Sequence, residues 1–147
     1  MNILCFGDSN TYGYKPDGTG RFDTDTRWTA LLQKKLGADH RVIEEGLCGR
    51  TTVFQDDLRE GRRGLDLIGI TMEMHNPIVL LILMLGTNDC KSRYNASAGT
   101  IAKGLHRSFR KPGKMLPSRL TFSSFHRSIW AKVLANLVLI RNLMRNL

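Results

Sequence analysis

Residues 2–13, "NILCFGDSNTYG", join a short apolar run directly to a polar turn. The run from Asn2 to Phe6 is ended by Gly7, and this pattern predicts a buried β-strand. One serine, Ser9, lies just past the predicted strand. A serine at this place can expose its hydroxyl at the edge of a sheet, where the amides that open the next helix point toward a bound oxygen.

The same turn has a simpler explanation, in which Asp8, Ser9 or Asn10 only caps the next helix. Taken alone, the turn favours the cap. The nucleotide-binding patterns G-x-x-x-x-G-K-[ST] and G-x-G-x-x-G are both missing after the strand. The nucleophile-elbow pattern G-x-S-x-G also fails, because Thr11 stands at the place of its second glycine.

The chain around this turn alternates between strand and helix patterns. Apolar residues at helical spacing predict a helix over residues 28–36, and a short strand is predicted over 41–45. A second helix is predicted over 58–74, and the continuous apolar run in "NPIVLLILML" (76–85) predicts a central strand buried on both faces. This order predicts an α/β fold, a three-layer α/β/α sandwich around a parallel sheet. A chain of 147 residues has the length of one domain.

Each predicted strand is followed by a polar turn that contains glycine, at residues 7–10, 46–52 and 86–89. Ligands bind at the carboxyl ends of the strands in such sheets, so we expect the three turns to lie at one edge. Asn88 in the third turn could donate its amide hydrogen to a developing oxyanion. The alternative for Asn88 and Asp89 is a turn that their side chains stabilise.

The three motifs "FGDSNTYG", "GLCGRTT" and "LGTND", in this order, resemble the SGNH or GDSL-type serine hydrolases, a lipase and acylhydrolase family, and in particular its arylesterase-like members. The resemblance covers roughly residues 1–103. It implies a flavodoxin-like SGNH hydrolase fold. It also implies hydrolysis of small carboxylic esters through an acyl-serine intermediate, with no metal and no cofactor.

The resemblance assigns a role to each matching position. Ser9 matches the nucleophile, whose own backbone amide helps to form the oxyanion hole. Gly49 matches the residue that supplies a second backbone amide, and Asn88 matches the side-chain amide donor. Asp8 and Asp89 match positions that mainly support the turns. A serine needs a base to remove its proton, and its tetrahedral oxyanion needs preorganised donors.

The base is missing from this pattern. The family ends in an Asp-x-x-His block, whose histidine is the base and whose aspartate orients it. No histidine of this chain has an acidic residue three places before it; the four are His40, His75, His106 and His126, preceded by Gly37, Met72, Lys103 and Ser123. We therefore expect an esterase with an impaired active site.

The charge distribution changes along the chain. All 13 acidic residues lie between Asp8 and Asp89, whereas residues 104–147 carry nine of the 22 lysines and arginines and no acid. We expect residues 1–105 to be the N-terminal part of an SGNH domain and 106–147 to be a basic, partly helical tail of non-family sequence. We interpret the family domain as truncated or frame-shifted after about residue 105.

The alternative makes the tail functional. Apolar and basic residues alternate at helical spacing over 128–147, so this segment can form a basic amphipathic helix. Such a helix could contact an anionic membrane, a nucleic acid or a partner protein, and the chain would then be a non-catalytic binding module. Nucleic acid is the least expected of these, because no aromatic platform or nucleic-acid motif accompanies the charge.

The cysteines, the N-terminal sequence and the apolar runs indicate the cellular compartment that we expect for this chain. Three cysteines, Cys5, Cys48 and Cys90, have no metal or redox spacing, and their odd number favours reduced thiols in the cytoplasm. No signal-peptide pattern opens the sequence. The longest apolar run has eight residues, well below the ~20 that span a bilayer.

The frame-shift hypothesis is tested by the coding DNA. The last 17 residues, "AKVLANLVLIRNLMRNL", permit codons that in a neighbouring frame read "GKGFGEPGFDPEFNEES", which resembles a loop of the arylesterase-like members. We expect the DNA to continue in that frame to an Asp-x-x-His block. A sequence without such a block in any neighbouring frame contradicts the hypothesis.

Overall fold

The computed structural model describes residues 1–110, with side chains through Ser108. The strands and helices follow the predicted alternation. In chain order they are β1 (Asn2–Gly7), α1 (Ser9–Tyr12), η1 (Thr24–Thr26), α2 (Trp28–Leu36), β2 (Arg41–Gly46), α3 (Gly64–Met74), β3 (Ile78–Met84), η2 (Asn88–Cys90), η3 (Ser92–Tyr94) and α4 (Ala98–Arg110).

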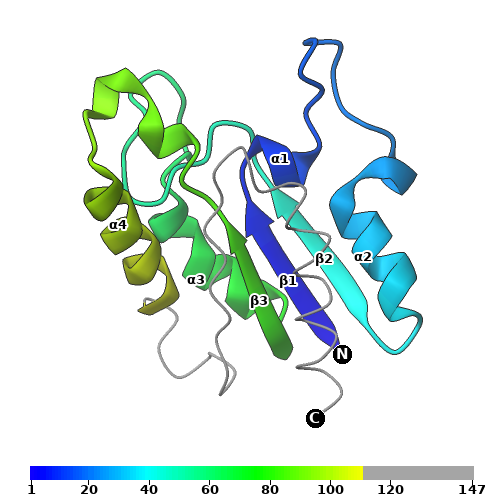
Figure 1. Ribbon diagram of the computed structural model, residues 1–147. Coiled ribbons are helices and arrows are strands. Elements are labelled where there is room, and N and C mark those ends of the chain that lie inside the picture. The colour runs from blue at the N-terminus through cyan, green and yellow to red at the C-terminus, as the bar shows by residue number, and fades with distance from the viewer. Residues whose placement is uncertain (111–147) are drawn as a thin grey trace.

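The sheet is parallel throughout its described part, with strand order β2-β1-β3. Its register places Gly7, the last residue of β1, beside Gly46 of β2 and Met84 of β3. The three strands therefore end at one level, and the turns that follow them leave the same edge of the sheet, as predicted. Figure 1 shows α1 and these turns together at that end.

Alternating residues of β1 face two separate apolar layers. Leu4 and Phe6 pack in a cluster with Ile68 and Met72 of α3 and with Leu105 of α4. Ile3 and Cys5 pack instead with Leu32 of α2, against which Trp28 and Leu36 are also placed. Strand side chains alternate between the two faces of a sheet, so α2 covers one face while α3 and α4 cover the other (Figure 1). This arrangement confirms the predicted α/β/α sandwich.

Two predicted elements differ in detail from the structure. The strand predicted as central, β3, lies at an edge of the described sheet, and Val79 on it is 40% exposed. Within residues 1–110, β1 is the strand that pairs with a neighbour on each side. The helix predicted from residue 58 begins only at Gly64, since the preceding backbone is engaged elsewhere: the Arg62 carbonyl accepts a hydrogen bond from Thr51 N–H, at 2.9 Å.

Helix α4 crosses the boundary predicted at residue 105. Leu105 belongs to the buried core and Ser108 is fully buried. The predicted tail helix over 128–147 lies outside the described residues. Within residues 1–110, no helix is long and apolar enough to cross a membrane.

Substitution of Gly46 tests the close approach of α1 to β2. An added Cβ at Gly46 would lie 2.1 Å from the backbone nitrogen of Tyr12, so helix and strand must separate. We expect Gly46→Ala to lower the free energy of unfolding by about 3 kcal/mol. Gly69 in α3 is the matched control, because nothing lies within 4 Å of an added Cβ there.

The control substitution has the opposite expected sign. Gly69→Ala removes a flexible residue from a helix interior and should raise the free energy of unfolding by up to about 1 kcal/mol. Urea unfolding of both variants measures the difference. Equal stability of Gly46→Ala and the wild type would contradict the tight contact between α1 and β2.

Candidate active site

Asp8, not Ser9, caps the helix that follows β1. One oxygen of the Asp8 carboxylate accepts hydrogen bonds from the backbone amide of Asn10, at 2.9 Å, and from the Asn10 side chain, at 3.1 Å. Ser9 is then the first residue of α1, and its Oγ has no hydrogen-bond partner among the described residues. Asp8 is therefore the residue that caps the helix, and the Ser9 hydroxyl is not used for capping.

Gly49 lies in a tight turn that only glycine adopts readily. Its φ is +85°, in the left-handed region that side chains disfavour. The next amide, Arg50 N–H, donates to the Leu47 carbonyl at 3.0 Å and closes the turn. The Gly49 N–H has no acceptor among the described residues, so it is available to a ligand.

Asn88 is held by the same turn. Its side-chain nitrogen donates to the backbone carbonyl of Arg50 at 3.0 Å, and the residue is 9% exposed. A primary amide carries two hydrogens, so one remains for a second acceptor.

The neighbouring Asp89 binds the turn one residue further on. Its carboxylate accepts from the Thr52 N–H at 3.0 Å and from the Thr52 hydroxyl at 2.5 Å. Asp89 is fully buried, and burial raises the pKa of its carboxyl. Burial also raises the pKa of Asp8, despite the hydrogen bonds that it accepts.

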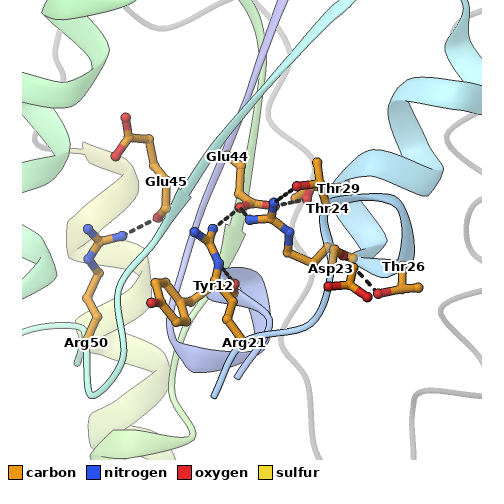
Figure 2. Close-up of polar contacts among 10 residues, drawn as sticks. Tyr12, Arg21, Asp23, Thr24, Thr26, Thr29, Glu44, Glu45 and Arg50 are labelled. Atoms are coloured by element: carbon orange, nitrogen blue, oxygen red, sulfur yellow. Dashed lines mark hydrogen bonds and ion pairs between the residues drawn. The ribbon is translucent and has the colours of Figure 1, made fainter. Parts of the chain in front are cut away.

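Arg50 is a site residue that the sequence analysis did not single out. It is 5% exposed, and its guanidinium lies over the Phe6 ring, 3.9 Å from the ring centre. One of its nitrogens donates to the Gly7 carbonyl at 2.9 Å. The same nitrogen donates to the Glu45 carbonyl (Figure 2). Burial lowers the pKa of Arg50 to about 10. The only sequence signal for this role was an arginine next to glycine inside a predicted turn.

A second charged cluster fixes the chain segment that follows α1. The Glu44 carboxylate binds Arg21 and Arg27, each at 2.5 Å, and also accepts from the Thr29 hydroxyl. Arg21 in turn donates to the Tyr12 carbonyl at 2.6 Å and lies over the Tyr12 ring (Figure 2). This cluster links residues 12–29 to β2 and so shapes one wall of the space in front of Ser9.

These elements border a pocket of about 560 Å³. Ser9, Gly49 and Asn88, the three positions that match the family's nucleophile and oxyanion donors, all line it. The other residues that line it are Tyr12, Tyr14, Gly20, Arg21, Leu47, Cys48, Arg59 and Lys91. Asp8 and Asp89 do not line the pocket. They stabilise its turns through their hydrogen bonds to Asn10 and Thr52. The arrangement offers a hydroxyl and several hydrogen-bond donors to one small ligand.

No histidine among the described residues lines this pocket. His75 lies at the end of α3, where its Nε2 is 2.8 Å from the Glu45 carboxylate. His126 lies outside the described residues. Within residues 1–110, no group of three His, Cys, Asp or Glu side chains is placed to hold a metal ion.

Comparison with known proteins identifies the family that the sequence matches. The model of the GDSL-like lipase/acylhydrolase family matches residues 5–138, a range that extends into the basic tail. A search of curated proteins gives no match.

Solved structures give close likenesses. An aryl esterase from M. smegmatis is 39% identical, with a TM-score of 0.73 over 82% of this chain and 61% of its own. A carbohydrate acetylesterase family member from Sinorhizobium meliloti is 40% identical, with a TM-score of 0.72 over 75% of this chain and 52% of its own. A putative arylesterase from Agrobacterium tumefaciens is 34% identical, with a TM-score of 0.74 over 82% of this chain and 61% of its own. The chain thus spans half to three-fifths of the length of these proteins.

Asp89→Asn tests the buried carboxyl through pH. The folded-state pKa of Asp89 is raised above its ordinary value of 3.8 by burial. The folded protein therefore keeps this proton to higher pH than the unfolded chain, and the carboxyl's contribution to stability is lost as pH rises from 3.8 through the folded-state pKa. We expect Asp89→Asn to make this fall in the free energy of unfolding less steep.

The measurement is urea unfolding of the wild type and the variant between pH 3.5 and 8, with roughly half a pH unit between points. Asp57→Asn, at an exposed carboxyl in a nearby turn, is the control for removal of one negative charge. A pH dependence of Asp89→Asn that is parallel to that of the wild type would contradict the proposed burial of an ionisable group at this position.

Proposed function

Because the chain belongs to the GDSL-like lipase/acylhydrolase family, we propose that its Ser9 pocket binds small carboxylic esters and that Ser9 is the nucleophile of an impaired ester hydrolase. The observation that carries the proposal is the convergence of Ser9, Gly49 and Asn88 on one pocket. Each comes from a different turn, and each turn follows a different strand of the sheet.

The chemistry follows from these positions. Ser9 Oγ attacks the carbonyl carbon of the ester, and the carbonyl oxygen becomes an oxyanion. Three donors are available for that oxygen: the N–H of Ser9, the N–H of Gly49 and the amide of Asn88. Donors already in place cost no reorganisation in the transition state, and one such donor is worth about 10²–10³ in rate.

The rest of the reaction needs a proton carrier. Collapse of the tetrahedral intermediate breaks the bond to the alcohol, which leaves after it takes a proton, and water then cleaves the acyl-serine. The base must first accept the Ser9 proton and later return it to the leaving group. This sequence has no Asp-x-x-His block, and no described histidine lines the pocket. We therefore propose that binding and oxyanion stabilisation are retained and that activation of the nucleophile is not.

The similar solved structures suggest which esters to test. They include an aryl esterase and a carbohydrate acetylesterase family member. We infer that short-chain acyl esters, acetate esters first, are the substrates to test. All three cysteines are free, in keeping with the reducing cytoplasm that we propose as the compartment.

Hydrolysis of p-nitrophenyl acetate by the purified chain tests the proposal. We expect turnover roughly 10⁶-fold below that of a serine hydrolase with an intact base, because the residues of such a catalytic group act as a unit. For the same reason Ser9→Ala should lower the rate little further. The release of p-nitrophenol above a protein-free blank measures both.

Each outcome bears on a different part of the proposal. Robust turnover that Ser9→Ala abolishes would contradict the impairment and would require a general base that the sequence does not reveal. Robust turnover that Ser9→Ala leaves unchanged would contradict the role of Ser9. Thr100→Ala, at an exposed hydroxyl near the start of α4, is the control for loss of a surface hydroxyl.

A second candidate function rests on the tail alone. Residues 104–147 carry nine lysines and arginines and no acidic residue. Such a segment can attract an anionic membrane, a nucleic acid or an acidic partner through its charge. The chain would then be a binding module, with or without ester hydrolysis.

Retention on heparin tests the tail, and deletion of residues 111–147 removes it while α4 stays complete. We expect salt-dependent retention of the full chain and a marked loss of retention in the truncated chain, because seven of the nine tail cations lie beyond Arg110. A truncated chain that elutes at the same salt concentration would rule out the tail as the binding segment.

A further inference from the structure

Among the residues that the structure describes, cations and no carboxylate line the pocket at Ser9. Arg21, Arg59 and Lys91 all contribute to its wall, and none of the other lining residues is acidic. The nearest acidic residue in sequence, Asp8, is buried beneath Ser9 and does not line the space. A ligand in this pocket therefore meets an excess of positive charge.

The three cations differ in whether a carboxylate of the described chain pairs with them. Arg21 is paired with Glu44, at 2.5 Å, and is not free to bind another anion at full strength. Arg59 and Lys91 form no ion pair with any residue of the described part of the chain. Their charges are therefore available to a ligand.

A neighbouring arginine, in contrast to Arg59 and Lys91, does form an ion pair. Arg93 lies two residues after Lys91, and it is paired with the buried carboxylate of Asp56 at 2.7 Å. Asp56 also accepts from the backbone amide of Leu58, at 3.1 Å, in the turn that leads to Arg59. Asp56 therefore pairs with Arg93 and not with Arg59 or Lys91.

The position of Arg59 connects its charge to the reacting groups. A Cβ built on Gly49 would lie 3.0 Å from Arg59 Nη1, so the guanidinium lies directly against the glycine of the oxyanion turn. Lys91 lines the same pocket three residues after Asn88, and its N–H donates to the Asn88 carbonyl at 3.3 Å. Two unpaired cations thus accompany two of the oxyanion donors.

We propose that this pocket selects esters that carry a carboxylate beside the scissile ester group, such as half-esters of dicarboxylic acids, and that Arg59 and Lys91 bind the carboxylate. The inference rests on the proposed ester binding and adds the substrate's charge to it. Arginine suits a planar carboxylate because its guanidinium can donate two parallel hydrogen bonds, and Lys91 adds a point charge. Neither residue takes part in bond cleavage, so both are specificity residues.

The test compares two esters of one dicarboxylic acid. Monoethyl succinate carries a carboxylate two methylene groups away from its ester, and diethyl succinate is the neutral counterpart. Titration of the full-length chain, followed by ligand-observed NMR, gives the dissociation constant of each without the need for turnover. We expect monoethyl succinate to bind more tightly than diethyl succinate, with an advantage that shrinks as salt is raised.

Substitutions assign the advantage to residues. The double variant Arg59→Gln, Lys91→Gln should weaken monoethyl succinate about fivefold, since exposed ion pairs contribute modestly, and should leave diethyl succinate unchanged. Lys34→Gln, at an exposed position of α2, is the matched control for loss of positive charge, and it should change neither constant. Both pocket residues are exposed, so the variants should fold, which circular dichroism verifies.

The outcomes separate this inference from the proposed function. Diethyl succinate that binds as tightly as monoethyl succinate would overturn the charge preference while ester binding stands. A preference that the double variant retains would overturn the assignment to Arg59 and Lys91. If neither ester binds, both the charge preference and ester binding by this pocket are wrong.

Discussion

The buried guanidinium of Arg50 is the contact on which the arrangement of the site depends. It donates to the last carbonyl of β1, at Gly7, and to the Glu45 carbonyl near the end of β2. Burial of a cation costs free energy unless hydrogen bonds and nearby charge offset it. Here two strand-end carbonyls and the face of Phe6 provide part of that compensation, while the buried Nε of Arg50 has no hydrogen-bond partner among the described residues. A side chain from the second turn thus fixes the level at which the first turn leaves the sheet.

The turn that contains Arg50 also holds the third turn. The carbonyl of Arg50 accepts from Asn88, and Thr52 donates twice to Asp89. The turn after β2 is therefore the shared partner of the turns after β1 and β3. This interlock brings Ser9, Gly49 and Asn88 to one pocket, and no histidine of the described residues lines it. Positioning and activation are separable in such a site, and the described residues account for positioning.

Much of this could be predicted from the sequence because the signals are local. Apolar runs ended by glycine predicted the strands, and the rule that parallel strands end at one edge predicted the meeting of the three turns. The interactions that fix the site are not local. Arg50 reaches Gly7 across 43 residues, and Glu44 binds residues 15 to 23 positions before it. Residue type alone did not indicate that these charges are paired inside the fold.

The differences from prediction have the same origin. The apolar run in β3 predicts a central strand, and within residues 1–110 it pairs with β1 alone, because strand pairing is a long-range property. The start of α3 was predicted six residues early because the hydrogen bond between Thr51 and Arg62 cannot be inferred from periodicity. Composition likewise does not reveal that Asp56 pairs with Arg93, while Arg59 and Lys91 form no ion pair among the described residues.

The most direct measurement of the Arg50 interlock is the amide NMR spectrum of Arg50→Lys. Lysine keeps the charge but lacks the planar fork and its fixed donor geometry. We expect the amide signals of Ser9 and Gly49 and the side-chain amide of Asn88 to shift together, while Arg41→Lys, at an exposed position at the start of β2, leaves all three in place. Shifts confined to Gly49, with Ser9 and Asn88 unchanged, would contradict the claim that one buried guanidinium holds the three turns in register.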